Sequence, residues 1–303
     1  MDWVRGFQHA IDYMEEHLTE PTDYEKIASE MHISVFYFQR IFTILCGMSP
    51  GEYIRNRRLS LAGSELVSTD HRIIDIALKY GYDTPEGFTR AFTKFHGAAP
   101  NVVRRNHLPI KSFAPLRISI SVKGGKSMNY RIVEKEAFTV LEKVENHAVI
   151  TDKNKKVENH AVITDKNKNE ISDFWDRVKK DGTVQTLVNA LADGKKNLMG
   201  ICYNDSSNSS ESFSYSIAAV CDENCTVPDG YRINCIPART WAIFECKGAM
   251  PDAIQKLWHR IVTEFFPTKD YEPTYEMDIE DYPDGDATSV DYTCWLWIPV
   301  RKK

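Results

Sequence analysis

Two segments of the sequence carry side chains of the types that read DNA, spaced to share one face of a helix. Arginine can pair bidentately with guanine and glutamine with adenine, at roughly 1–3 kcal/mol of discrimination per good pair. The side chains are Phe36, Gln39, Arg40 and Thr43 in the first segment and Glu86, Thr89, Arg90 and Lys94 in the second. The spacing predicts that each set is exposed and could lie in a DNA groove. An ordinary amphipathic hairpin with a solvated outer face is the alternative for either segment alone.

Each set lies in a predicted helix-turn-helix unit. Gly81 can end one helix in the left-handed conformation, Thr84 with Pro85 can begin the next, and Ser34 is an N-cap upstream. The two units share an alanine, two aromatic residues, an arginine, a glycine and a proline: Ala28, Phe38, Phe42, Arg40, Gly47 and Pro50, then Ala77, Phe88, Phe92, Arg90, Gly97 and Pro100. A helix from residue 50 joins them, so two reading helices could enter successive major grooves roughly 34 Å apart.

The composition is that of a globular protein, with 42% hydrophobic and 27% charged residues among 303. No apolar run approaches the length that spans a bilayer, and the first residues predict a charged amphipathic helix rather than a signal peptide. We therefore expect a cytoplasmic protein. Seven cysteines in so long a chain favour reduced thiols over a disulfide framework.

Charge is divided unevenly along the chain. Between residues 88 and 111 there are five basic residues and no acidic one, whereas residues 128–303 hold 22 Lys and Arg against 29 Asp and Glu. This distribution indicates that the N-terminal half, rather than the C-terminal half, meets a polyanion.

Residues 1–107 resemble the DNA-binding domain of the AraC/XylS family of bacterial transcription regulators. The resemblance rests on SVFYFQRIF at residues 34–42, YIRNRRLSLA at 53–62, IIDIALKYGY at 73–82 and FTRAFTKFHGAAPNVVRR at 88–105. It implies an all-α domain of seven helices with two helix-turn-helix units, which binds double-stranded promoter DNA as a monomer. It further implies base contacts by Phe36, Gln39 and Arg40, and an activator that recruits RNA polymerase.

The second reading helix departs from the family pattern at Pro85 and Glu86. Proline cannot donate a hydrogen bond, and phosphates repel a glutamate. That helix could therefore anchor on phosphates through Arg90 and Lys94, with Glu86 reading a cytosine amino group as the less favoured option.

Residues 108–127 are expected to form an extended linker, because the region around them contains two prolines and a Gly-Gly pair. The pattern then changes. Strands are predicted over residues 129–144, 197–204, 213–220, 274–282 and 292–300, with a bulge at Glu136 and Ala137, and residues 231–247 are predicted to be rich in strand around Pro237. Helices are predicted over 170–180, 186–191 and 250–266. The order strand, helix, strand, strand, repeated once, predicts a pseudo-symmetric α+β domain over residues 128–303 and a multi-domain chain.

A tandem repeat interrupts this domain. KVENHAVITDKNK occurs at residues 143–155 and again, unchanged, at 156–168. One repetition of 13 residues is not a solenoid. Identity at every position suggests a recent duplication or a sequence error, and we expect one copy to form an exposed loop before the next helix.

Residues 128–303 resemble the GyrI-like effector-binding domain. The best matches are YRINCIPARTWAIFECKG at 231–248, IQKLWHRIVTEFF at 254–266, DIEDYPDGD at 278–286 and TCWLWIPVRKK at 293–303. The resemblance implies binding of a small amphipathic, often cationic, effector. We expect no enzymatic activity, although some GyrI-like domains hydrolyse reactive small molecules. The resemblance also implies that Glu280 projects into the binding site.

The residues around Glu280 fit that implication. Asp278 and Tyr282 share its face of the predicted strand, and Trp295 and Trp297 share a face of the last strand. A carboxylate among aromatic rings suits a cation with an apolar body, at roughly 0.5–2 kcal/mol per ring. The candidate effector site is Glu280, Tyr282, Trp295, Trp297, Trp241, Tyr215 and Trp175, with Tyr203 as a further member. The alternative for each tryptophan is a place in the core, which is the expectation for Trp258.

No cofactor or metal is expected. The histidines lack metal-binding spacing, and a site built on Cys221, Cys225, Cys202 and Cys235 is a minor alternative. Two other functions stay open for the C-terminal domain. It could hydrolyse a reactive small molecule, with Glu280 as base and Tyr282 or Tyr275 as its partner, or it could act as a protein-interaction or sequestration module.

Overall fold

The computed structural model describes residues 3–118, 127–148, 163–192, 197–203 and 212–303. The chain forms two compact units, each considered by itself. Among the described residues, the first comprises residues 3–32 and 48–118, and the second comprises residues 33–47, 127–148, 163–192, 197–203 and 212–303. The helix that contains Arg40 therefore belongs to the second unit. No helix in the described ranges is both long enough and apolar enough to span a membrane.

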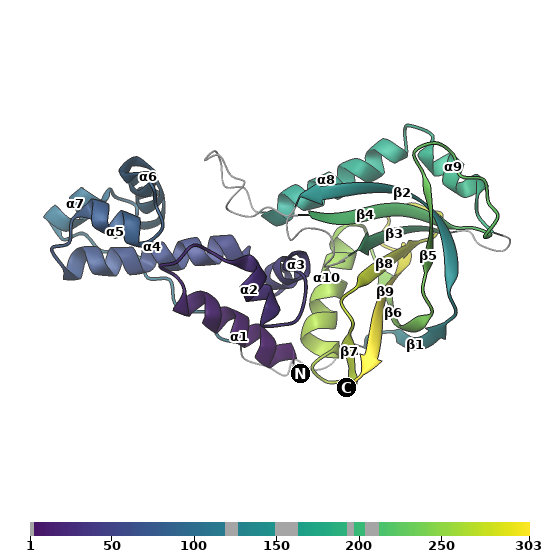
Figure 1. Cartoon of the computed structure of the whole chain (residues 1–303), viewed down its shortest axis with the longest axis horizontal. Coiled ribbons are helices and arrows are strands. Elements are labelled where there is room, and N and C mark those ends of the chain that lie inside the picture. Colours follow the sequence, from purple (N-terminus) through teal and green to yellow (C-terminus); the bar gives the residue numbers. More distant parts are fainter. Residues whose placement is uncertain (1–2, 119–126, 149–162, 193–196, 204–211) are drawn as a thin grey trace. The chain divides into compact units, whose positions relative to one another are not determined.

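The helices of the N-terminal region follow the sequence prediction closely (Figure 1). They are α1 (Trp3–Glu16), α2 (Tyr24–Ser29), α3 (Val35–Cys46), α4 (Pro50–Ser68), α5 (Ile73–Lys79), α6 (Pro85–His96) and α7 (Pro100–Asn106). The predicted caps are confirmed. The Ser34 hydroxyl accepts from the Tyr37 N–H at 3.2 Å, and the Thr84 hydroxyl accepts from the Gly87 N–H at 3.1 Å. Gly47 and Gly97 end α3 and α6 in the left-handed conformation.

The core of the first unit is built where α5, α6 and α7 pack on α4. Its buried members are Leu59, Ala62, Leu66, Ile76, Ala77, Tyr80, Phe88, Phe92 and Val103. Phe88 and Phe92 are fully buried, with ring centroids 5.4 Å apart, so the predicted apolar stripe of α6 is confirmed. Burying this stripe fixes which face of α6 remains outside.

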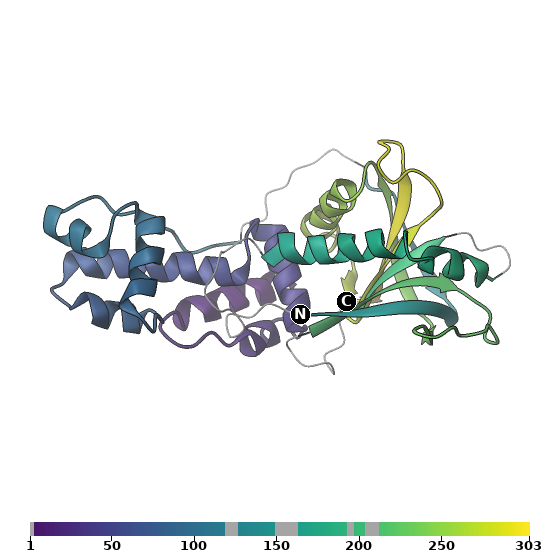
Figure 2. The ribbon, with the colours of Figure 1, turned by 90° about the horizontal axis from the view of Figure 1, so that it is seen from above.

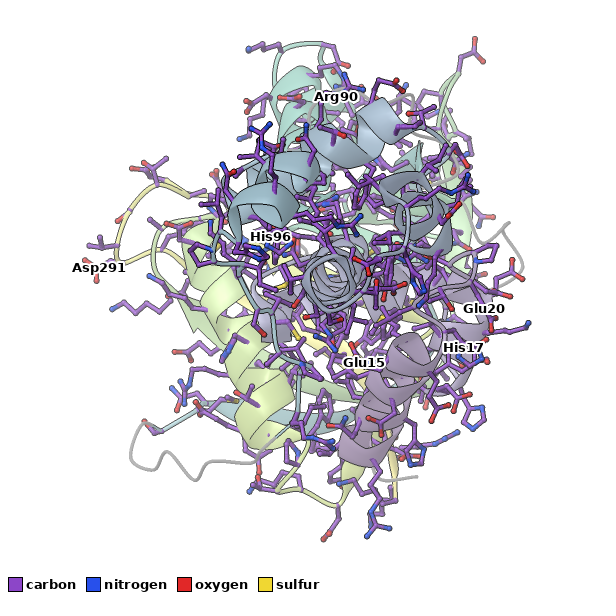
Figure 3. All side chains as sticks on the ribbon, turned by 90° about the vertical axis from the view of Figure 1, so that its left-hand side faces the viewer. Glu15, His17, Glu20, Arg90, His96 and Asp291 are labelled. Atoms are coloured by element: carbon purple, nitrogen blue, oxygen red, sulfur yellow. The ribbon has the colours of Figure 1, made fainter. Side chains whose placement is uncertain are left out.

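The predicted linker begins as an extended strap along α4. The backbone N–H of Lys111 donates to His96 Nδ1 at 3.1 Å, that of Phe113 to Ser60 Oγ at 2.9 Å, and that of Leu116 to the Tyr53 hydroxyl at 3.1 Å. Figure 3 shows His96 pointing toward α4, and its Nε2 lies 2.9 Å from the Leu59 carbonyl oxygen. Through residue 118 the chain is thus held by the first unit.

The second unit contains a nine-stranded sheet in the order β1-β6-β9-β8-β3-β4-β2-β5, with β7 paired to β9. All pairs are antiparallel. The elements are β1 (Tyr130–Lys135), β2 (Phe138–Ala148), α8 (Ile163–Val178), α9 (Thr183–Asn189), β3 (Leu198–Tyr203), β4 (Ser212–Val220), β5 (Arg232–Ile236), β6 (Arg239–Lys247), α10 (Asp252–Arg260), β7 (Tyr271–Pro273), β8 (Met277–Tyr282) and β9 (Thr293–Lys302). The predicted α+β class is confirmed.

Two predictions within this unit need correction. Residues 129–144 are not one bulged strand but two strands, because β1 pairs with β6 while β2 pairs with β4 and β5. The strand-rich stretch predicted around Pro237 is confirmed as β5 and β6, which are separated at that proline because it has no N–H to donate to a ladder. The helix expected over 250–266 is α10 followed by a π-helical turn, Ile261–Phe265.

The tandem repeat is divided between two elements. Residues 143–148 of the first copy lie in β2, and residues 163–168 of the second copy lie in α8. The loop expected between them falls on residues 149–162, outside the described residues. Figure 2 shows α8 running across the sheet, and Arg177 of α8 pairs with Glu145 of β2 at 2.5 Å.

Candidate functional site

Strand β8 alternates as predicted. Asp278, Glu280 and Tyr282 point to one face of the sheet, and Met277, Ile279 and Asp281 point to the other. Asp278 is buried and Glu280 is half-buried. The other face packs into a core that includes Ile279. The Cα atoms of two acidic residues therefore lie about 7 Å apart along one strand, and both side chains are on the face opposite that core.

Glu280 accepts hydrogen bonds from two tyrosines. The Tyr282 hydroxyl donates to its Oε2 at 2.8 Å and the Tyr215 hydroxyl at 3.3 Å. The Trp175 indole N–H of α8 donates to the Tyr215 hydroxyl at 3.0 Å, and the Trp175 ring meets Tyr282 edge-on with centroids 5.4 Å apart. The structure thus brings together four of the predicted effector residues, Glu280, Tyr282, Tyr215 and Trp175.

Gly200 of β3 makes room for this arrangement. It pairs in register with Glu280, and a Cβ added there would lie 2.0 Å from the Tyr215 hydroxyl oxygen and 2.9 Å from the ring carbon that bears it. No ordinary side chain fits without displacing Tyr215. A glycine at this position is therefore part of the site, and the sequence pattern did not reveal it.

Gly200→Ala is expected to lower the free energy of unfolding of the second unit by about 2 kcal/mol, because it overpacks a filled position. Tyr215→Phe in the same chain removes the nearest clashing atom and should restore part of that loss. Denaturant unfolding of the two single variants and the double variant gives the coupling energy. Additive effects would show that Tyr215 is not the obstructing group.

Burial governs the ionisation of this cluster. It raises the pKa of Glu280 above its usual 4.5, although the charge of Arg40 opposes the rise. Burial also raises the pKa of Tyr215 and Tyr282 well above 10, and the charge of Glu280 adds to the rise. At neutral pH the tyrosines are therefore neutral donors, and the site disfavours the charged form of Glu280.

Glu280→Gln is expected to stabilise the second unit at pH 7, by about 1 kcal/mol or roughly 2–4 °C in Tm. A raised pKa in the folded state means that the folded state holds the proton more tightly than the unfolded state, so ionisation costs stability. The gain should vanish as pH falls below 4.5, where the carboxyl is neutral in both states. Thermal unfolding against pH checks this, with the exposed Glu276→Gln as control. A lower Tm at pH 7 would contradict it.

The remaining predicted aromatic residues lie elsewhere. Trp295 and Trp297 are paired with Asp281 and Ile279, so they point to the face away from Glu280, whose neighbour on β9 is Leu296. Trp241 is fully buried, 5.9 Å from Trp297 between ring centroids. The expectation that these three tryptophans would lie around Glu280 is wrong. Strand β9 pairs with β8 so that Leu296 lies opposite Glu280, and a shift of one residue moves the tryptophans to the other face of the sheet.

Tyr203 belongs to a different cluster, around Glu142 of β2. Glu142 is fully buried and accepts from the Tyr203 hydroxyl at 2.5 Å, the Ser216 hydroxyl at 2.7 Å and Arg232 Nε at 2.7 Å. Sequence reasoning missed this network. Its signal in the sequence was Glu142 itself, which takes the alternate strand position between Val140 and Val144.

The first reading helix is not exposed, contrary to prediction. Gln39 and Thr43 are only 5% and 9% exposed. Arg40 Nη1 donates to Asp278 Oδ2 at 2.7 Å, and its guanidinium lies over the Trp258 ring of α10 at 4.4 Å. These contacts lie within the second unit. The prediction failed because helical spacing says which side chains share a face, but not what covers that face.

Phe36 and Arg40 hold α3 on the sheet and α10. The Phe36 ring stacks on Phe213 of β4, with centroids 3.8 Å apart and an angle of 17°. Burial alone would lower the pKa of Arg40, but the charges of Asp278 and Glu280 outweigh it and the pKa is raised. Arg40 is therefore a permanent cation on this face. Trp258 is fully buried, as expected of a core residue.

The second reading helix has the open face that was predicted. Glu86, Arg90 and Lys94 are exposed on α6, and Thr89 is half-buried. Arg90 lies on the outside of α6 (Figure 3). The two candidate DNA-reading surfaces thus differ in the structure, since one is covered and the other is open.

The cysteines show no metal site. Cys46, Cys202, Cys221, Cys225, Cys235, Cys246 and Cys294 are all free thiols. Within the described ranges, no group of three His, Cys, Asp or Glu residues could hold a metal ion.

The β-sheet region identifies the family. The sequence model described as "Cass2: Integron-associated effector binding protein" matches residues 131–300, more than half of the chain. The chain belongs to this family. A second model, described as a helix-turn-helix domain, matches residues 27–106. This member of the effector-binding family therefore carries an AraC-type helix-turn-helix domain before its effector-binding fold, an arrangement that resembles the right origin-binding protein.

Curated relatives of this effector-binding family member match over about a third of the chain. HTH-type transcriptional regulator YbfP of Bacillus subtilis (strain 168) is 43% identical over 104 residues, 34% of this chain and 35% of that protein. Transcriptional activator AarP of Providencia stuartii is 37% identical over 92 residues, which are 30% of this chain and 68% of that protein. The right origin-binding protein of Escherichia coli (strain K12) is 36% identical over 106 residues, which are 35% of this chain and 37% of that protein. The match thus spans about a third of the length of YbfP and of the right origin-binding protein.

Solved structures resemble the effector-binding fold more distantly. SAV2435 bound to tetraphenylphosphonium has a TM-score of 0.47 at 22% identity, covering 57% of this chain and 94% of that one. The integron cassette protein VCH_CASS2 of Vibrio cholerae has a TM-score of 0.37 at 17% identity, and the match covers 57% of this chain and 95% of that one.

Proposed function

We propose that the protein is a DNA-binding transcription regulator, an activator, whose C-terminal domain binds a small amphipathic cation. The observation that carries the effector part is the environment of Glu280. No basic side chain in the described ranges lies within ion-pair distance of its carboxylate, yet burial disfavours its charge. A half-buried acid without a salt-bridge partner is unfavourable for folding, and a cationic ligand would compensate it.

The surroundings of Glu280 suit a ligand with an apolar body. Trp175, Tyr215 and Tyr282 lie around the carboxylate, and their hydroxyl and indole groups are already bonded to each other or to Glu280. The half-buried rings of Trp175 and Tyr282 can each contribute cation–π attraction of roughly 0.5–2 kcal/mol, whereas the Tyr215 ring is buried. Glu142 provides the contrast, because Arg232 already neutralises it.

The DNA-binding part rests on the two helix-turn-helix units. Arg90 and Lys94 of α6 are exposed and suited to phosphates, with Thr89 and Glu86 beside them. Phe36, Gln39, Arg40 and Thr43 of α3 would make base contacts. Two reading helices in one chain allow a monomer to occupy an asymmetric promoter site, with RNA polymerase as the protein partner.

Calorimetry of the full-length protein tests the effector part. Tetraphenylphosphonium should bind saturably, whereas tetraphenylborate, its near-isosteric anion, should bind far more weakly. Equal binding of both ions, or of neither, would overturn the proposal. For the DNA part, full-length protein should enrich a defined sequence from a random duplex library with the cation present, and failure to enrich any sequence would overturn that part.

A further inference from the structure

The position of Arg40 links the two proposed sites. Its side chain comes from the DNA-reading stripe of α3, and it ends between Asp278 of β8 and the Trp258 ring of α10. A guanidinium paired with a carboxylate and placed over an indole face has the same chemistry as the ligand proposed for Glu280. The protein therefore supplies its own cation to this face of the sheet.

The two cation positions are neighbours on one face of the sheet. Asp278 and Glu280 are alternate residues on one strand face, about 7 Å apart, and Cys202 of β3 lies in register beside Asp278. The Asp278 side chain is 2% exposed and that of Arg40 is 19% exposed, so the guanidinium is largely withdrawn from water. A bulky cation at Glu280, in contact with Trp175 and the tyrosines, would occupy space beside Arg40 and add a like charge to it.

The docked position of α3 also carries a cost. Gln39 is 5% exposed, and its amide Nε2 has no hydrogen-bond partner in the described ranges. A buried amide without a partner costs about 1–3 kcal/mol. Adenine would satisfy that amide through N7 and N6. The contacts of Arg40 and Phe36 therefore hold α3 in place although the Gln39 amide is buried without a partner. Release of α3 would remove that unfavourable free energy.

We propose that Arg40 is an internal competitor of the effector, so that cation binding at Glu280 displaces the guanidinium from Asp278 and releases α3 to read DNA. This inference rests on the proposed function and adds its regulation. In the ligand-free protein, the residues that would read bases are covered by the effector-binding fold. The effector raises DNA affinity because it binds only the released state, and DNA in turn raises effector affinity by the same factor.

The first test measures the affinity of the full-length protein for tetraphenylphosphonium by calorimetry. Arg40→Ala should bind the cation about ten-fold more tightly than wild type, because the competitor is gone. Arg40→Lys keeps the positive charge and should stay near the wild-type affinity. Arg105→Ala, an exposed arginine of α7, is the matched control and should not change it. Unchanged or weaker binding by Arg40→Ala would overturn the inference.

The second test follows α3 directly. Hydrogen exchange of the amides of residues 35–46 should accelerate when the cation is added to wild-type protein, and should be fast without the cation in Asp278→Asn. If the exchange rates of these amides do not change when the cation binds, the inference is wrong. If the proposed function itself is wrong, the result is distinguishable, because neither wild type nor Arg40→Ala would then bind the cation.

Discussion

Glu280→Gln should weaken tetraphenylphosphonium binding about 30-fold or more, which corresponds to about 2 kcal/mol or above. The substitution keeps the shape of the side chain and its capacity to accept from Tyr282 and Tyr215, but removes the charge. A partly desolvated carboxylate attracts a cation more strongly than an exposed one does, because less water screens the pair.

Calorimetry of full-length protein at pH 7 measures this loss. Glu276→Gln, an exposed carboxylate just before β8, is the control and should bind as wild type does. The pKa of Glu280 is raised, so wild-type affinity should also fall as pH drops toward that pKa, while the affinity of the glutamine variant should not. Equal affinity in wild type and Glu280→Gln would place the cation away from this carboxylate.

Phe88→Ala should lower the free energy of unfolding of the first unit by about 3–5 kcal/mol. Phe88 is fully buried and contacts both Phe92 and Tyr82, with ring centroids 5.4 and 5.3 Å away. Its removal leaves a cavity beneath the reading face of α6. Because a domain is stable by only about 5–15 kcal/mol, DNA binding should fail well below the wild-type Tm.

Denaturant unfolding monitored by circular dichroism gives the change in free energy. Leu78→Ala is the comparison, since Leu78 is an apolar helical residue that is 58% exposed and should cost under about 1 kcal/mol. Similar losses in the two variants would mean that the apolar stripe of α6 does not hold the unit together.

Local signals in the sequence predicted most of the helical region. The caps at Ser34 and Thr84 and the stops at Gly47 and Gly97 act within a few residues, so sequence alone placed α3 and α6 within a residue or two. The alternation of β8 is equally local and placed Glu280, Asp278 and Tyr282 on one face. The grouping of Glu280 with Tyr215 and Trp175 was predicted only as part of a larger aromatic set.

The failures at the candidate sites depend on long-range pairing. Nothing near Trp297 in the sequence indicates that its partner on β8 is Ile279 rather than Glu280, and one residue of register decides the face. Likewise, nothing near Arg40 points to Asp278, which is 238 residues away. Gly200 became informative only when the space around it was known, because its neighbour Tyr215 comes from another strand.

The strap along α4 has a practical consequence for dissecting the chain. A fragment cut at residue 107, where the family resemblance ends, would leave His96, the Ser60 hydroxyl and the Tyr53 hydroxyl without the backbone donors that they meet here. It would also uncover Tyr53, whose ring meets Phe113 edge-on. An N-terminal fragment for solution work should therefore end after Ile118, whose N–H reaches Gln8 of α1 at 2.9 Å.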